Sequence, residues 1–113
     1  MSEENLFKLS GMAATAQAEI QKNYKGVDPI IGLIRNLRAS GFPADAMTID
    51  CLKSGKRITL VLHDDKPGEV AYQFGFRDKD PDMDFEYLAF DKVTKDQLYA
   101  WIKEYIADDA GVI

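Results

Sequence analysis

The sequence is poor in the residues that build most catalytic and metal sites. Its 113 residues include one histidine and one cysteine. Zinc sites that draw on several histidines or cysteines are therefore excluded, and an intramolecular disulfide cannot form. A lone thiol also fits a reducing compartment, so we expect a cytoplasmic protein.

Long apolar runs and a leader-like N-terminus are missing as well. No apolar stretch approaches the roughly 20 residues that a membrane-spanning helix needs. The opening MSEENLFKLS carries acids where a signal peptide carries bases. We therefore expect neither a membrane span nor a secretion signal.

Basic residues are in the minority. Fourteen Lys and Arg stand against nineteen Asp and Glu, which gives a net charge of −5. Nucleic-acid binding depends on a basic surface that displaces counterions from phosphates, so nucleic acid is not an expected partner. The negative balance favours solubility and would speed the approach of a basic protein.

Two helical segments are predicted in the first third of the chain. Residues 3–24 carry apolar side chains at spacings of three and four, which is one face of a helix. Asp28 and Pro29 then have the character of an N-cap and a first helical residue. The expected buried stripe of this second helix is Ile30, Ile31, Leu33, Ile34 and Leu37.

Four strands are predicted after these helices, because four short segments are rich in β-branched or aromatic residues and are separated by turn residues. The segments are residues 46–52, 57–63, 69–77 and 84–90. With a two-residue turn at Ser54-Gly55, apolar residues face one another across the meander. The expected opposite pairs are Ile49 with Leu60, Leu60 with Tyr72, and Phe74 with Tyr87.

The segment VTKDQL begins the last helix. Thr94 and Gln97 have the spacing of a capping box, and Val93 and Leu98 that of a hydrophobic staple around it. The expected fold is therefore α+β, in one domain over residues 1–113. It has two N-terminal helices, a four-stranded antiparallel meander and one C-terminal helix, with the helices packed on one sheet face.

An acidic loop, RDKDPDMDF, is the most unusual local pattern. Its alternating aspartates resemble the start of a calcium loop, but Met83 replaces the required glycine and Ala89 the final glutamate. We therefore expect no metal and no cofactor. The first three aspartates of the loop are predicted instead to contact a protein partner: Asp78, Asp80 and Asp82.

The same register predicts an apolar strip on the sheet face opposite the helices. Such a strip on a solvated face is a candidate contact surface, and its members are Val61, Ala71, Leu88 and Phe90. Two alternatives stay open at this point. A shift of the last strand by one residue would turn Leu88 and Phe90 inward and Phe85 and Tyr87 outward, and a helix on that side would cover the strip.

The sequence favours a small acidic protein-interaction module, such as an adaptor, an inhibitor or an immunity-type protein, without catalytic activity. Its expected partner is a protein, in particular a basic one, or a second copy of the chain. The alternative is a small-molecule-binding protein or small enzyme with a pocket between helices and sheet. Aromatic residues with polar groups would line that pocket: Tyr72, Tyr87, Trp101 and Tyr105.

Overall fold

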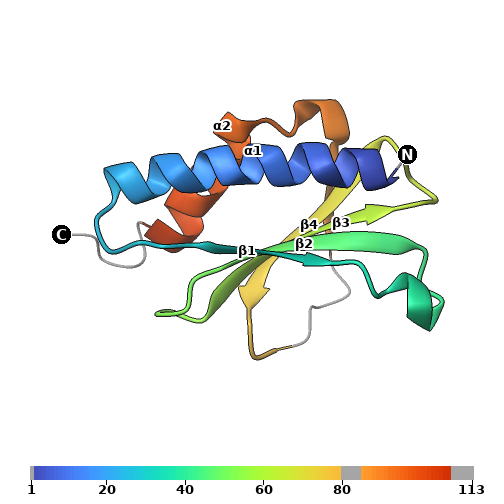
Figure 1. The fold of residues 1–113 in the computed structure, drawn as a ribbon, viewed down its shortest axis with the longest axis horizontal. Helices are drawn as coiled ribbons and strands as arrows, with labels where there is room; N and C mark the ends of the chain where they lie inside the picture. Colours follow the sequence, from blue (N-terminus) through green and yellow to red (C-terminus); the bar gives the residue numbers. More distant parts are fainter. Residues whose placement is uncertain (1, 80–84, 108–113) are drawn as a thin grey trace.

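A five-stranded antiparallel sheet carries two α-helices on one of its faces (Figure 1). The computed structural model describes residues 2–79 and 85–107. The strands lie in the sheet in chain order, from β1 to β5. The α+β class and the antiparallel sheet are thus confirmed, whereas the expected numbers of helices and strands are wrong. Within the described ranges, no helix has the length and apolar character that a membrane span requires.

The first helix, α1 (Ser2–Asn23), lies against the sheet along one face. The five apolar positions that define this face are all buried: Leu6, Leu9, Ala13, Ala16 and Ile20. Two of them are alanines, whose small side chains let the helix axis come close to the strands. Asn23 in the last turn donates a hydrogen bond to the Tyr99 hydroxyl (2.8 Å), which ties α1 to the C-terminal helix.

The predicted second helix is instead a strand, β1 (Ile30–Ile34), paired antiparallel with the next strand. A short apolar run fits a helix stripe and a strand equally well by its spacing, and β-branched residues favour the strand. Gly32 allows close packing here, because a Cβ atom at this position would lie 3.0 Å from Thr48 Oγ1. A 3-10 turn, η1 (Arg38–Ser40), follows β1 and ends at Gly41, which has a φ of 86°.

The second and third strands, β2 (Ala44–Asp50) and β3 (Lys56–His63), pair two residues out of the expected register. Ile49 lies opposite Ile58 rather than opposite Leu60. The turn is longer than two residues, since the Gly55 N–H donates to the Cys51 carbonyl and Gly55 has a φ of 77°. An even slip leaves every side chain on its expected face, so the predicted apolar face survives.

The fourth strand, β4 (Glu69–Phe76), pairs with β3 in the predicted register, with Leu60 opposite Tyr72. The fifth strand, β5 (Glu86–Ala89), is shorter than expected and is displaced by three residues. Tyr87 lies opposite Ala71 rather than opposite Phe74. An odd displacement moves side chains to the other face, so Tyr87 belongs to the face opposite the helices.

The C-terminal helix begins as predicted. The Thr94 side chain accepts a hydrogen bond from the Gln97 N–H (3.1 Å), and α2 (Lys95–Ile102) continues into a π-helical turn, η3 (Lys103–Ala107). Between β5 and α2 lies a short 3-10 turn, η2 (Phe90–Lys92). Both helices and the inner sheet face share one core, in which the largest fully buried residues are Leu9, Ile20, Met47, Ile49, Ile58, Leu60, Leu98, Ile102, Ile106, Val70 and Pro29.

Candidate functional site

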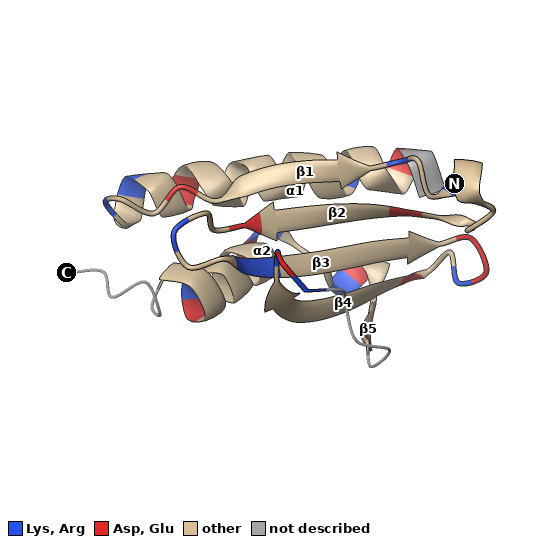
Figure 2. Cartoon of the chain, turned by 90° about the horizontal axis from the view of Figure 1, so that it is seen from below, with Lys and Arg blue, Asp and Glu red and all other residues tan. Residues whose placement is uncertain are grey.

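The sheet face opposite the helices is open. Figure 2 looks onto this face, and α1 and α2 both lie behind the strands. Residues directly opposite one another in an antiparallel sheet share a face, so the strand pairings identify the side chains that form it. One row crosses all five strands and consists of Ile34, Ala46, Val61, Ala71 and Tyr87. We call this row the central row.

The central row has no charged member, and its side chains are smaller in the middle of the sheet than at the edges. Ala46 and Ala71 are small and buried between their neighbours, whereas Tyr87 on the edge strand is 51% exposed. The adjacent row is also uncharged, with Gly32, Thr48, Thr59 and Gln73 opposite one another. An uncharged area spanning a whole sheet is unusual on a solvated face, and it makes this face the leading candidate for a contact surface.

The structure places only half of the predicted apolar strip on this face. Val61 and Ala71 lie opposite each other in the central row, as expected. The predicted outward placement of Leu88 and Phe90 is wrong, because Leu88 pairs with Val70 and both residues pack against the core. The displacement of β5 turns them inward and brings Tyr87 out instead. Ile34 was missed because its segment has the spacing of a helix.

Charged side chains border the open face at one end. Asp50, on β2, is 8% exposed and accepts hydrogen bonds from Arg57 Nε (2.7 Å) and Arg57 Nη2 (3.0 Å). Arg77 Nε lies 3.4 Å from the same carboxylate. The hydrogen bonds to Asp50 raise the pKa of the Arg57 guanidinium above its ordinary value, against the opposing effect of burial. Two cations on one carboxylate give this end fixed polar groups.

The opposite end of the open face carries aromatic and basic groups. The rings of Phe42 and His63 meet edge to face with centroids 5.3 Å apart. Lys66 Nζ lies 4.2 Å from the centroid of the Tyr87 ring, in the geometry of a cation–π contact. Uncharged rows thus lie between polar ends, an arrangement that would fix the orientation of a bound molecule.

Three of the four aromatic residues of the alternative pocket lie in one ring cluster around Phe74, and the fourth lies apart from it. Tyr72 stacks on Trp101 with centroids 4.5 Å apart, and Tyr105 stacks on Phe74 at 5.1 Å. The Tyr105 hydroxyl donates to the Gly75 carbonyl (2.8 Å), so its polar atom has a partner. Tyr87 lies on the other sheet face. Three cavities formed by the described residues are all lined by other side chains than these four.

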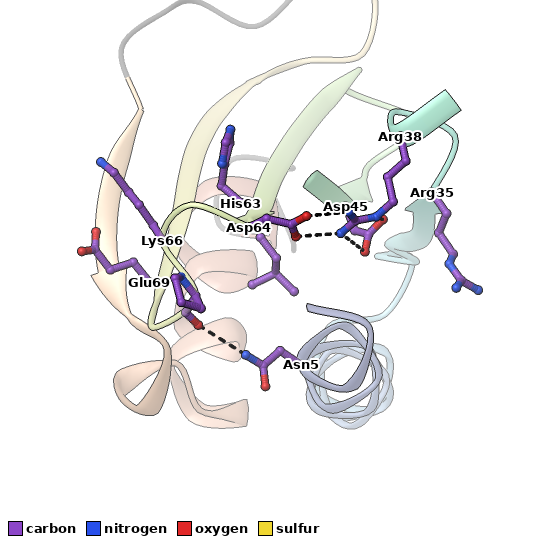
Figure 3. Close-up of a pocket in the computed structure, with 10 residues that line it drawn as sticks. Asn5, Arg35, Arg38, Asp45, His63, Asp64, Lys66 and Glu69 are labelled. Carbon is purple, nitrogen blue, oxygen red and sulfur yellow. Dashed lines mark hydrogen bonds and ion pairs between the residues drawn. The ribbon is translucent and has the colours of Figure 1, made fainter. Parts of the chain in front are cut away.

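A polar cavity of about 510 Å³ lies at one end of the sheet (Figure 3). Arg38 occupies one side of it and bonds two carboxylates. Its Nε and Nη2 donate to Asp45 (3.2 Å each), and its Nη1 and Nη2 donate to Asp64 (2.7 and 2.9 Å). These bonds, that to Asp64 foremost, raise the pKa of Arg38 above its ordinary value. Asn5 of α1 closes the other side by donating to the Pro67 carbonyl (3.5 Å).

This cluster was missed at the level of the sequence. Asp45 is 2% exposed and lies opposite Leu62 on the inner face. Asp45 lies just before the segment expected as a strand, residues 46–52, so no expected pairing placed its side chain. Two further cavities lie elsewhere. One of about 430 Å³ lies beside Arg77, and an apolar one of about 600 Å³ lies between α1 and η2, with Phe7 and Phe90 in its wall.

The acidic loop is only partly described. Asp78 is exposed, whereas Asp80 and Asp82 lie outside the described residues. In residues 2–79 and 85–107, no group of three or more His, Cys, Asp or Glu side chains is placed to hold a metal ion. Searches of protein-family models, of curated proteins and of solved structures found no match to this chain.

Proposed function

We propose that the protein is a small, non-catalytic interaction module that binds the apolar side of a helix from a protein partner on its open sheet face. The observation that supports this is the uncharged area of the central row and the row beside it. Apolar contact there would gain about 25 cal/mol per Å² removed from water. The acidic residues Asp78, Asp80 and Asp82 remain predicted contacts.

The dimensions of the face suit a helix. Its large side chains stand on the two edge strands, Ile34 on β1 and Tyr87 on β5, while small side chains occupy the middle. Strands lie about 4.8 Å apart, so four spacings separate these edges by roughly 19 Å. A helix with its side chains is about 10–12 Å wide. It would lie over the small residues, with the polar ends of the face available for its flanking groups.

The test is co-purification from the protein's own cell with matched surface variants. Val61→Lys places a charge in the middle of the central row, and Thr15→Lys places the same charge on the exposed side of α1. We expect a stoichiometric partner that survives high salt, because apolar contacts are not screened. It should be lost with Val61→Lys and kept with Thr15→Lys. A partner that both variants keep would contradict the proposal.

A separate variant tests whether the acidic loop, rather than the sheet face, binds the partner. Charge reversal at Asp80 and Asp82 together should weaken binding only modestly and only at low salt, since exposed charge contacts are screened. If this reversal removes the partner while Val61→Lys does not, the loop and not the sheet face is the binding surface.

A second candidate function is small-ligand binding, and the cavity beside Arg38 is the observation that favours it. Pockets for small molecules commonly measure 300–1,000 Å³. A compound that binds there should raise the melting temperature of the native chain, by linkage. The shift should vanish in Asn5→Trp, which fills the cavity, and persist in Glu4→Trp on the neighbouring exposed position. A compound library that gives no such shift argues against this candidate.

A further inference from the structure

Strand β1 is an edge of the sheet, and after Pro29 its own five residues include no charge and no proline. Its sequence, IIGLI, has no charge, and Ile30 and Leu33 are 42% and 46% exposed. Edge strands that stay unpaired are usually interrupted by charges, prolines or bulges. The other edge follows this rule, since β5 is four residues long, includes Glu86 and has Lys66 over its tyrosine.

The direction of the backbone groups in β1 follows from the ladder beside it. The Cys51 N–H donates to the Lys56 carbonyl and the Asp64 N–H to the Pro43 carbonyl, so the odd-numbered residues of β2 bond to β3. In an antiparallel strand the bonding side alternates. The even-numbered residues of β2 therefore bond to β1, and their partners are Ile30, Gly32 and Ile34.

It follows that Ile31 and Leu33 direct their N–H and C=O groups away from the sheet. Pro29 has the same parity, and its carbonyl does accept a bond from the Gln17 side chain rather than from a strand. Within the described chain, no segment pairs with the outer side of β1. Two residues thus present four backbone groups to a further strand.

We propose that the partner strand is β1 of a second copy, paired antiparallel about a two-fold axis at Gly32. In this register the outward-directed residues meet each other, Ile31 opposite Leu33 of the second copy. On the open face Ile30 meets Ile34 of the second copy. Every facing pair is apolar, and the two central pairs, which are related by the two-fold axis, exchange four backbone hydrogen bonds in total.

The strand sequence supports the same register. IIGLI is nearly symmetric about Gly32 in size and apolar character, which is what pairing of a strand with its own copy about a two-fold axis requires. Gly32 meets Gly32 at the axis, in a non-hydrogen-bonded position where the two Cα atoms lie only about 4.5 Å apart. A strand from an unrelated protein would have to match this apolar pattern in the opposite chain direction. A second copy of β1 matches it by its own near-symmetry. The inference does not depend on the proposed helix partner.

The test is the solution mass over a concentration series, by light scattering on a sizing column. We expect the native chain to rise from 12.7 kDa to twice that mass. Two double variants are compared, and they differ only in the sign of the charge introduced at residue 34. Ile30→Lys with Ile34→Lys brings lysine against lysine across the axis and should stay at the monomer mass. Ile30→Lys with Ile34→Glu creates two ion pairs across it and should regain the double mass at low salt.

Far-UV circular dichroism of both variants checks that they fold alike. A native chain that stays at 12.7 kDa over the whole concentration series overturns the proposal. So does a dimer that persists in the lysine–lysine variant, or equal masses for the two double variants. Val61→Lys separates this inference from the proposed function, because it should abolish helix binding and leave the dimer intact.

Discussion

Arg38 holds together three segments that are distant in sequence. It lies in the turn after β1, Asp45 is the second residue of β2, and Asp64 follows β3. Asp45 is 2% exposed, and burial of a carboxylate is unfavourable unless it is paired and hydrogen-bonded. The bidentate contact with Arg38 meets that requirement. The polar cavity therefore rests on a buried carboxylate that is held by a partly exposed guanidinium.

Replacement of Arg38 by methionine should lower the urea midpoint of unfolding clearly, because it leaves Asp45 buried without a cation. Replacement of both residues, Arg38→Met with Asp45→Leu, should recover most of that loss, because it removes the buried carboxylate that Arg38→Met leaves without a cation. Equilibrium urea unfolding of both variants measures this. Lys25→Met, which removes an exposed cation outside this cluster, is the control, and a double variant no better than the single one would contradict the argument.

At the scale of elements, the sequence predicts those whose signals agree. The capping residues Thr94 and Gln97 and the buried stripe of α1 were read correctly, since periodicity and caps point to one structure there. The segment after Asp28 has conflicting signals. Its Asp-Pro start and apolar spacing favour a helix, while three isoleucines favour a strand, and pairing with β2 decides the outcome.

Strand register shows a second limit, because it depends on loop length. The β3–β4 pairing was predicted, and the slip of two between β2 and β3 changed no face. The displacement of β5 by three residues did change faces, and with it half of the predicted contact surface. The sheet face on which a side chain lies therefore depends on the length of the turn before its strand. A single sequence does not reveal that length when the connection, like the one between β4 and β5, lacks a strong turn signature.

At the scale of the whole molecule, one core joins both helices to one sheet face. This continuity bears on α1, whose buried stripe contains two alanines and so offers less apolar area than a leucine-rich helix. Leu9 contributes a fully buried side chain, while Phe7, in the same turn region, is 66% exposed. A substitution at Leu9 therefore tests the packing of α1 against the core, whereas a substitution at Phe7 tests only the stability of the helix itself.

Leu9→Ala should lower the free energy of unfolding by about 2–5 kcal/mol, since it opens a cavity in the shared core. Phe7→Ala should change it by no more than about 0.5 kcal/mol, as an exposed substitution. Two probes report the unfolding of different parts of the molecule. The fluorescence of Trp101, the single tryptophan, reports on the contact of α2 with Tyr72 of the sheet, on which it stacks. Far-UV circular dichroism includes the signal of the 22 residues of α1. With one cooperative core, both probes should give the same urea midpoint for Leu9→Ala. If dichroism is lost at lower urea while Trp101 fluorescence is unchanged, α1 docks independently and the core is not a single unit.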